Sequence, residues 1–302
     1  MNNIQYAQIY LNAMDLIYQQ EALTRDIEGN ESQIMPAGYG EFKVAKVDVS
    51  GLGDFERNVG YAKGSGKFTW ETIKMQKERS IELRVDRLEN GEALDKAFSA
   101  MCSELTRTKV IPEVDAARVA NIFGYEGIKT IGEKITTAQE VIKALRTAAN
   151  YMDNAEVPAE NRILWINTNL LSLIEDMNTY ESKAVLNKFS VIKPFPERRF
   201  YTDITLNDGT ESFGYVPATG AHIGNFIVFH KGAVVAKTAQ FMKYFTPDED
   251  QTADDHVMQY RNNSLFAYIF ENKLEGVYGS YNTDTVSTET EETDNQEEGG
   301  TE

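Results

Sequence analysis

The sequence predicts an α+β fold that is organised around one long helix, with a β-hairpin projecting before it. Three observations predict this fold class. Residues 94–123 carry apolar residues at helical spacing, residues 38–90 carry strand patterns interrupted by glycines, and strands alternate with helices from residue 126 onward. Together they indicate an elongated subunit.

The long helix is indicated by Leu94, Phe98, Met101 and Leu105, which recur at i, i+4, i+7 and i+11 and so share one helical face. Proline has no N–H to donate and its ring clashes with the preceding turn, so Pro112 predicts a kink or a restart of the helix. Helix-compatible sequence resumes directly after it. If the two halves form one bent helix, it is about 45 Å long.

The N-terminal region predicts a second amphipathic helix. Residues 3–25 carry apolar residues at mostly helical spacing, and Gly29 and Asn30 mark where the helix ends. Two interpretations stay open, a core helix and an arm that docks on a neighbouring molecule.

The first strand of the projection shows a change of pattern. Phe42 and Val44 alternate with polar residues on one parity, whereas Val47 and Val49 lie on the other parity. A change of parity moves the apolar side chains to the opposite face of the strand. We therefore expect a β-bulge or a sheet edge near residues 45–46.

The projection continues through a turn-rich tip to two further strands. Five glycines between residues 51 and 66 predict turns and few large apolar groups, and strands follow over residues 68–75 and 80–86. An isolated hairpin is at best marginally stable in water, so this one needs a surface to lie on. Eight acidic and eight basic residues between 54 and 92 fit an exposed ribbon, or salt bridges to a partner with the same mixture.

The region after residue 126 reads as an α/β unit. Thr137 and Glu140 have the spacing of a capping box at the start of a helix that reaches Tyr151. The other expected elements are a strand at 163–166, a helix at 170–177, a strand at 185–193, an apolar strand at 225–235, an acidic loop at 247–255 and a last block at 260–281 that ends in a strand.

The charge is unevenly distributed. Of the net charge of −17, eight negative charges lie in residues 284–302, which contain no basic residue, so the remaining body carries about −9. We expect this tail to be disordered. An acidic body argues against general electrostatic binding of nucleic acid, which needs clustered Lys and Arg. The single cysteine, Cys102, and the lack of a signal peptide or a long apolar run point to a soluble protein of the cytoplasm, without a membrane partner.

No reactive constellation emerges from the motifs. The GSGK at residues 64–67 lacks both the first glycine and the hydroxyl residue of a phosphate-binding loop, and the three histidines have no partner at metal-ligand spacing. Arg198 and Arg199 could contact an anion, but a structural ion pair is the better interpretation. We predict no catalytic, cofactor-binding or metal-binding residues, and therefore a protein built for contacts between copies.

Several blocks, in this order along the chain, resemble the tailed-phage (Caudoviricetes) major capsid proteins of the HK97 fold. The block GLGDFERNVGY at 51–61 resembles the Gly-Leu-x-Asp-Tyr-x-Arg-x-x-Gly-Tyr segment of that family, and ERSIELRVDRLEN at 78–90 resembles its next block except at Glu78 and Ser80. The further blocks are FTWET at 68–72, VIPEVDA at 110–116, YRN at 260–262 and ENKLEGVY at 271–278.

The resemblance implies a domain plan. It consists of an N-terminal arm at 1–37, an extended hairpin called the E-loop at 38–92, the spine helix of a peripheral domain at 93–125, a mainly axial α/β domain at 126–255, a return to the peripheral domain at 256–283 and the acidic tail at 284–302. The E-loop would lie over an adjacent subunit. Its candidate contact residues are Arg57, Tyr61, Lys67, Trp70 and Arg79, and Pro112 is the candidate kink of the spine.

The function implied by the resemblance is that of a major capsid protein and not of an enzyme. Copies would assemble in the host cytoplasm into hexamers and pentamers of an icosahedral virion shell. That shell would enclose double-stranded DNA without sequence-specific contacts and carry a portal at one vertex. We expect a separate scaffolding protein and no cofactor.

Three alternatives stay open. An encapsulin-like compartment shell would have the same fold. A soluble α/β enzyme would use the strand-to-helix turn at residues 165–170, and a phage tail or connector protein would form tubes or rings.

Overall fold

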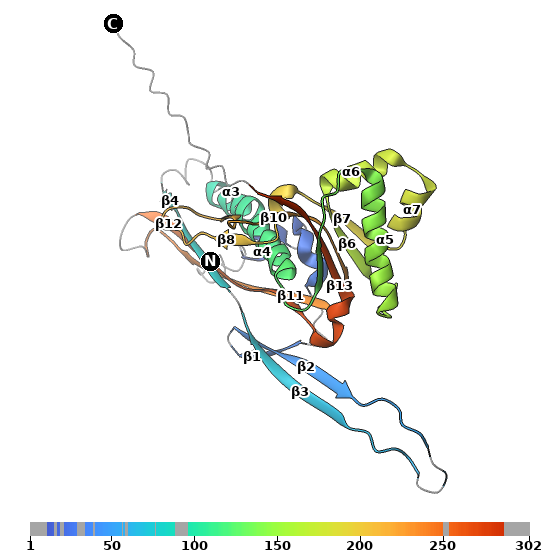
Figure 1. Cartoon of the computed structure of the whole chain (residues 1–302). Helices are drawn as coiled ribbons and strands as arrows, with labels where there is room; N and C mark the ends of the chain where they lie inside the picture. Colours follow the sequence, from blue (N-terminus) through green and yellow to red (C-terminus); the bar gives the residue numbers. More distant parts are fainter. Residues whose placement is uncertain are drawn as a thin grey trace.

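The computed structural model shows a layered body from which a β-ribbon projects (Figure 1). Strands and helices alternate along the chain, as the predicted mixture of α and β structure requires. The structure describes residues 11–14, 17–18, 21–28, 34–38, 40–55, 57, 60–75, 77–87, 96–249 and 254–286. Most of the predicted N-terminal helix and residues 287–302 of the predicted acidic tail lie outside these ranges.

A five-stranded mixed sheet forms the middle layer. Its strands, in spatial order, are β5 (Lys129–Gly132), β13 (Val277–Thr285), β10 (His222–His230), β6 (Arg162–Asn167) and β7 (Val191–Phe195). β6 runs parallel to β7 and antiparallel to β10. Every residue of β6 is buried, which explains the continuous apolar run at residues 163–166.

Alternate residues of β6 contribute to two hydrophobic cores. Leu164 and Ile166 pack with helices α5 (Ala138–Asn154), α6 (Thr168–Met177) and α7 (Tyr180–Leu186) on one face. Ile163 and Trp165 pack on the opposite face, against helix α4 (Ile111–Phe123) and the ends of the second sheet. Successive side chains of a strand point to opposite faces. The five-stranded sheet therefore packs on one face against α5, α6 and α7 and on the other against α4 and the ends of the second sheet.

The second sheet is antiparallel and consists of β11 (Val234–Phe245), β12 (Asp255–Ile269) and β4 (Lys77–Asp86). Helix α3 (Lys96–Leu105) and the start of α4 cover it. Leu105 and Ile111 of these helices pack with Met258 and Tyr260 of β12.

The predicted long helix is continuous from α3 through α4. A π-helical turn, Thr106–Val110, joins them, and the N–H of Ile111 donates to the carbonyl of Thr106 five residues back. Val110 and Ile111 keep right-handed helical dihedrals, so the helix does not restart at Pro112, the second residue of α4. The wide turn lies where proline removes a hydrogen bond from the ladder. A bend at this point stays a prediction.

The ribbon is the segment 41–74, with strands β2 (Glu41–Val49) and β3 (Gly66–Lys74), and β1 (Ile34–Gly38) pairs with its base. β2 and β3 pair from Glu41–Lys74 to Val49–Gly66 without any shift of register. Of the two alternatives predicted near residues 45–46, the bulge is therefore wrong, whereas the sheet edge is confirmed, because β1 pairs with β2 only as far as Val44. A small hairpin of β8 (Ile204–Leu206) and β9 (Tyr215–Pro217) lies beside α4.

The projection is shorter than the sequence suggested. β4 was expected to belong to it, but β4 pairs with β12 along ten residues and lies in the body (Figure 1). The alternation of apolar and charged residues in β4 predicts one buried face, whether the strand lies in the projection or in the body. Only the strand that pairs with β4 distinguishes these two locations.

Three further expectations need correction. The predicted strand at 185–193 is the end of α7 followed by β7, because the side chain of Thr179 caps a helix there. The expected strand at 225–235 is two strands in different sheets, β10 and β11. The last strand, β13, lies in the five-stranded sheet and extends to Thr285, into the segment assigned to the tail.

Candidate assembly interface

The base of the ribbon is anchored to the body by one of its faces. Phe42 and Val44 of β2 are buried in a small core with Leu265 and Phe270. On the same face, Lys46 Nζ lies 2.6 Å from a carboxylate oxygen of Glu71 across the ribbon. It also lies 2.9 Å from a carboxylate oxygen of Glu271, in the turn after β12. Hydrogen bonds to these two carboxylates raise the pKa of Lys46.

The opposite face of the ribbon is apolar and exposed. Ala45 lies opposite Trp70, Val47 opposite Phe68, and Val49 opposite Gly66. Directly opposite residues of an antiparallel pair point to the same side, so Ala45, Val47, Val49, Phe68 and Trp70 form one stripe, called here the outer face. Phe68 is 57% exposed and Trp70 is 44% exposed, with their rings in edge contact at 5.3 Å between centroids.

The outer face explains the change of parity in β2. Near its base the strand buries Phe42 and Val44 against its own body, whereas farther out Val47 and Val49 point the other way and contact no core. One continuous strand therefore has a buried apolar face near its base and an exposed apolar face farther out. A strand whose apolar residues are buried on one face near its base and exposed on the opposite face farther out shows the same change of parity as a strand with a bulge.

The tip of the ribbon, residues 50–65, carries more apolar surface than predicted. Leu52 is fully exposed, and the exposed rings of Phe55 and Tyr61 pack at 5.1 Å between centroids. Gly60 has a φ of 97°, a left-handed conformation that glycine adopts without strain. Clustered exposed aromatic residues at the end of a long projection are typical of an interaction surface.

Four of the five predicted contact residues lie together on the ribbon. Tyr61 and Trp70 belong to the apolar surfaces just described, and Arg57 and Lys67 are exposed. The prediction missed Val47, Val49 and Phe68, which their parity could have revealed. Whether these residues touch another subunit stays a prediction.

Arg79 lies elsewhere, in β4, and makes its contacts within the chain. Its guanidinium pairs with both carboxylate oxygens of Glu113, at 2.7 and 3.0 Å. It also donates to the carbonyls of Asn207 and Gly214 in the β8–β9 hairpin. Arg79 thus joins β4, the first turn of α4 and the β8–β9 hairpin. Its guanidinium N–H groups donate to partners within the same chain.

The alternative enzyme site, at residues 165–170, contains polar groups with structural roles. The Asn167 side chain accepts the N–H of Asn169 and caps α6, and Thr168 Oγ1 donates to the carbonyl of Phe195. Asn169 Nδ2 donates to Glu197.

Among the described residues, no group of three or more His, Cys, Asp or Glu side chains could hold a metal ion. Burial raises the pKa of the Cys102 thiol to about 12.

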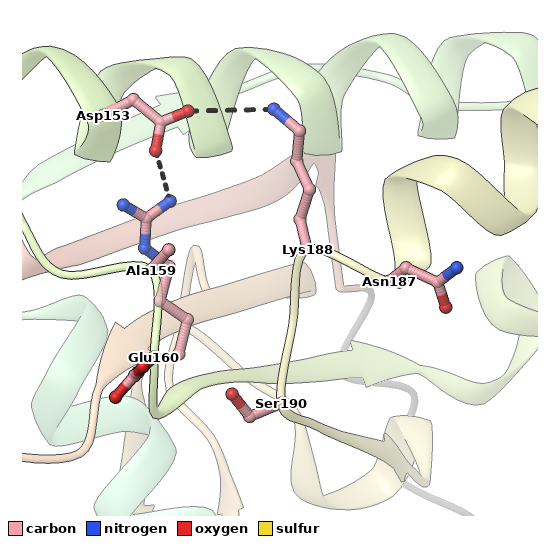
Figure 2. A pocket seen from close by; sticks show the side chains of 7 residues that line it. Asp153, Ala159, Glu160, Asn187, Lys188 and Ser190 are labelled. Atoms are coloured by element: carbon pink, nitrogen blue, oxygen red, sulfur yellow. Dashed lines mark hydrogen bonds and ion pairs between the residues drawn. The ribbon is translucent and has the colours of Figure 1, made fainter.

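A pocket of about 370 Å³ lies between the end of α5 and the loop that precedes β7. The Asp153 carboxylate lies 2.7 Å from the guanidinium of Arg162 and 3.7 Å from Lys188 Nζ. Figure 2 shows the side chains of Asp153 and Lys188 directed toward each other. Arg162 also donates to the carbonyls of Val157 and Pro158. These contacts join the α5–β6 loop to the α7–β7 loop and so have a structural role.

The expected structural ion pair of Arg199 is also present, with Asp115 at 3.4 Å.

Solved structures with a similar fold include phage capsids and a virus-like particle. The capsid of the cyanophage P-SCSP1u matches with a TM-score of 0.59 and 14% identity, over 87% of this chain and 89% of that chain. The capsid of Myoviridae phage XM1 matches with a TM-score of 0.53 and 10% identity, over 86% and 90%. A virus-like particle from Pyrococcus furiosus matches with a TM-score of 0.55 and 12% identity, over 91% and 99%.

These likenesses extend over most of each chain, and they show that the protein has the HK97-like fold of phage capsid proteins. The resemblance drawn from the ordered sequence blocks is confirmed at this level. No protein-family model matches the sequence, and no curated protein matches it. In the described part of the chain, none of the helices combines the length and apolar composition needed to cross a membrane.

Proposed function

We propose that this protein is a major capsid protein of a tailed phage. Its copies assemble into hexamers and pentamers of an icosahedral shell in the host cytoplasm, and the shell encloses double-stranded DNA. The ribbon acts as the E-loop, residues 96–123 act as the spine helix, and a separate scaffolding protein and a portal complete the assembly. The fold of the phage capsid structures supports this proposal.

The observation that carries the proposal is the apolar outer face of the ribbon. Its aromatic and branched side chains point away from the body to which the ribbon is anchored. Burial of a large apolar side chain is favourable by about 1.5–3 kcal/mol, so covering several of them supplies a driving force for association. Repeated on every subunit, such contacts build a closed shell from many modest interfaces.

Replacing the outer face tests the proposal. The variant Phe68→Ser/Trp70→Ser removes two exposed rings and should leave the subunit folded, with an unchanged circular dichroism spectrum and melting temperature. We expect the yield of fast-sedimenting particles to fall at least about tenfold, since one lost contact of about 1.4 kcal/mol already changes an equilibrium tenfold. The matched control is Tyr180→Ser in α7, another exposed aromatic residue. Particle yields equal to wild type in the ribbon variant would refute the role of the outer face.

An encapsulin-like compartment is the second candidate, because the likeness to the Pyrococcus furiosus virus-like particle is nearly as strong. The contents of purified particles distinguish the two. Packaged double-stranded DNA, with terminase and portal genes beside this one, supports the phage capsid. A protein cargo encoded next to the chain supports the compartment.

A further inference from the structure

Residues 23–28, called here the η1 segment, lie against the second sheet and the long helix. They consist of the short 3₁₀ helix η1 (Leu23–Ile27) and the residue after it. Ile27 is fully buried in the core that contains parts of α4, β6 and β11. Glu28 forms an isolated parallel bridge with Ala236 of β11. The η1 segment is therefore packed into the body of its own chain.

The five-stranded sheet contacts the η1 segment through one lysine. Lys193 Nζ, from β7, donates to the carbonyl of Leu23 at 3.0 Å and lies 2.5 Å from a carboxylate oxygen of Asp26. Only 16% of the Lys193 side chain and 20% of the Asp26 side chain are exposed. A partly buried ion pair is screened less by water and salt than a surface pair. Lys193 therefore links the five-stranded sheet to the η1 segment in a defined geometry.

A buried arginine of α4 links the η1 segment to the second sheet. Arg118 donates to Thr24 Oγ1 at 2.7 Å and pairs with Glu28. It also donates to Thr238 Oγ1, in β11, at 2.9 Å. The Arg118 side chain is fully buried, so water cannot replace a partner that it loses. The guanidinium thus holds the η1 segment and β11 in one fixed arrangement.

The basic groups at this joint depend on the η1 segment for their counterions. Three basic and three acidic side chains form the ion pairs there: Lys193, Arg118, Arg199, Asp26, Glu28 and Asp115. Two of the three carboxylates, those of Asp26 and Glu28, belong to the η1 segment. Without the segment, three basic groups would share the single carboxylate of Asp115. Leaving a buried cation without its partner is strongly destabilising, which keeps the segment bound.

The long helix lies between the two sheets and packs on both through apolar side chains. Val119 and Ile122 lie in the core that α4 shares with β6 and β10, and Ile111 and Val114 lie in the core that it shares with β12. Apolar contacts are non-directional, and packed layers can slide past one another by small amounts. Hydrogen-bonded ion pairs instead require one geometry. The contacts of the η1 segment therefore add direction to a joint that apolar packing alone leaves adjustable.

We propose that the η1 segment is a lock that fixes the angle between the two sheets of the subunit. Its contact on the five-stranded sheet is Lys193, and its contact on the second sheet is Thr238, reached through Arg118. When either contact is removed, the two sheets turn relative to each other about α4. In the proposed shell this angle sets how a subunit meets its neighbours. That consequence rests on the proposed function, whereas the lock itself is a property of the single chain.

Distances between spin labels on the two layers test the lock in the unassembled subunit. The labels are placed at two exposed positions, Glu175→Cys in α6, which covers the five-stranded sheet, and Lys243→Cys in β11. Cys102 is buried and stays unlabelled. Pulsed electron paramagnetic resonance should give one narrow distance distribution for this labelled protein.

Two variants each remove one contact of the lock. Lys193→Met removes the amine, and Thr238→Val keeps the shape of the side chain but removes its hydroxyl. Both should stay folded by circular dichroism and should broaden or shift the distance distribution. Lys193→Arg, which keeps the charge, and the control Lys183→Met, at an exposed position in α7, should leave it unchanged. Identical distributions in all four variants would overturn the proposal.

Particle diameters test the consequence for assembly. Lys193→Met should widen the spread of diameters in electron micrographs, and Lys193→Arg should retain the native spread. Failure of the native chain to form particles would refute the proposed function, whereas the spin-label distances would still decide on the lock. A native spread of diameters in Lys193→Met, together with unchanged distances, would refute the lock alone.

Discussion

Removal of the buried carboxylate of Asp115 tests how the N-terminal segment is held to the long helix. The side chain is fully buried in α4, where it accepts the N–H groups of Leu23 and Thr24 at 3.2 and 3.1 Å and the hydroxyl of Thr24 at 2.7 Å. One turn away, fully buried Arg118 donates to Thr24 Oγ1 at 2.7 Å and pairs with Glu28. Burial raises the pKa of Asp115, and its hydrogen bonds and the charge of Arg118 oppose this shift.

The expected cost of Asp115→Ala follows from these contacts. Two backbone N–H groups lose their acceptor, at about 1–3 kcal/mol for each buried unsatisfied group. Arg118 keeps Glu28 as its counterion but loses a nearby carboxylate, and breaking a buried ionic network costs about 3–5 kcal/mol. Both figures describe the loss of the same carboxylate and are not added, so we expect the free energy of unfolding to fall by about 3–5 kcal/mol.

Urea unfolding of the unassembled subunit, followed by circular dichroism, measures this loss. Limited proteolysis provides a local readout, because trypsin should cut faster after Arg25 once the segment is released. Asp176→Ala, at an exposed position in α6, is the control and should change stability by less than about 0.5 kcal/mol. A loss below about 1 kcal/mol for Asp115→Ala, with unchanged cleavage after Arg25, would refute the reasoning.

Three further predictions concern the helix, the capping box and the tail. Pro112→Ala should keep the subunit folded and let a regular turn replace the π turn Thr106–Val110. We therefore expect a change in particle size, yield or expansion in electron micrographs. Particles identical to wild type would show that the proline is incidental. Hydrogen bonds from Thr136 and Thr137 lower the pKa of Glu140, so its stabilising effect is present at neutral pH and lost as pH falls. Glu140→Gln should therefore lower the melting temperature more at about pH 7 than at about pH 3, and an equal shift at both would contradict this. Truncation after Val286, which keeps β13 intact, should leave assembly unchanged, and loss of particles would contradict a dispensable tail.

Local sequence signals predicted the elements whose causes are local. The capping box of Thr137 and Glu140 starts α5 as expected, and the Asn167 side chain caps α6 directly after the apolar strand β6. Their hydrogen bonds join residues two to four positions apart in the chain. Such contacts can be read from spacing alone.

The errors arose where a distant partner decides the structure. β4 has the alternation of a half-buried strand, and nothing within it shows that its partner is β12, which lies more than 150 residues later. The burial of Asp115 and Arg118 depends on residues near position 24, about 90 residues away. The change of parity in β2 left a bulge and a sheet edge as alternatives, because the sequence of one strand does not show where its own core ends.

We propose that this chain closes a shell with copies of itself. Electron microscopy of the full chain, co-expressed with the proposed scaffolding protein, tests this most directly. We predict closed particles with icosahedral order, in which averaged density shows a ribbon crossing onto the adjacent subunit. Protein that stays monomeric with scaffold present, or that forms only open rings or tubes, would contradict the account.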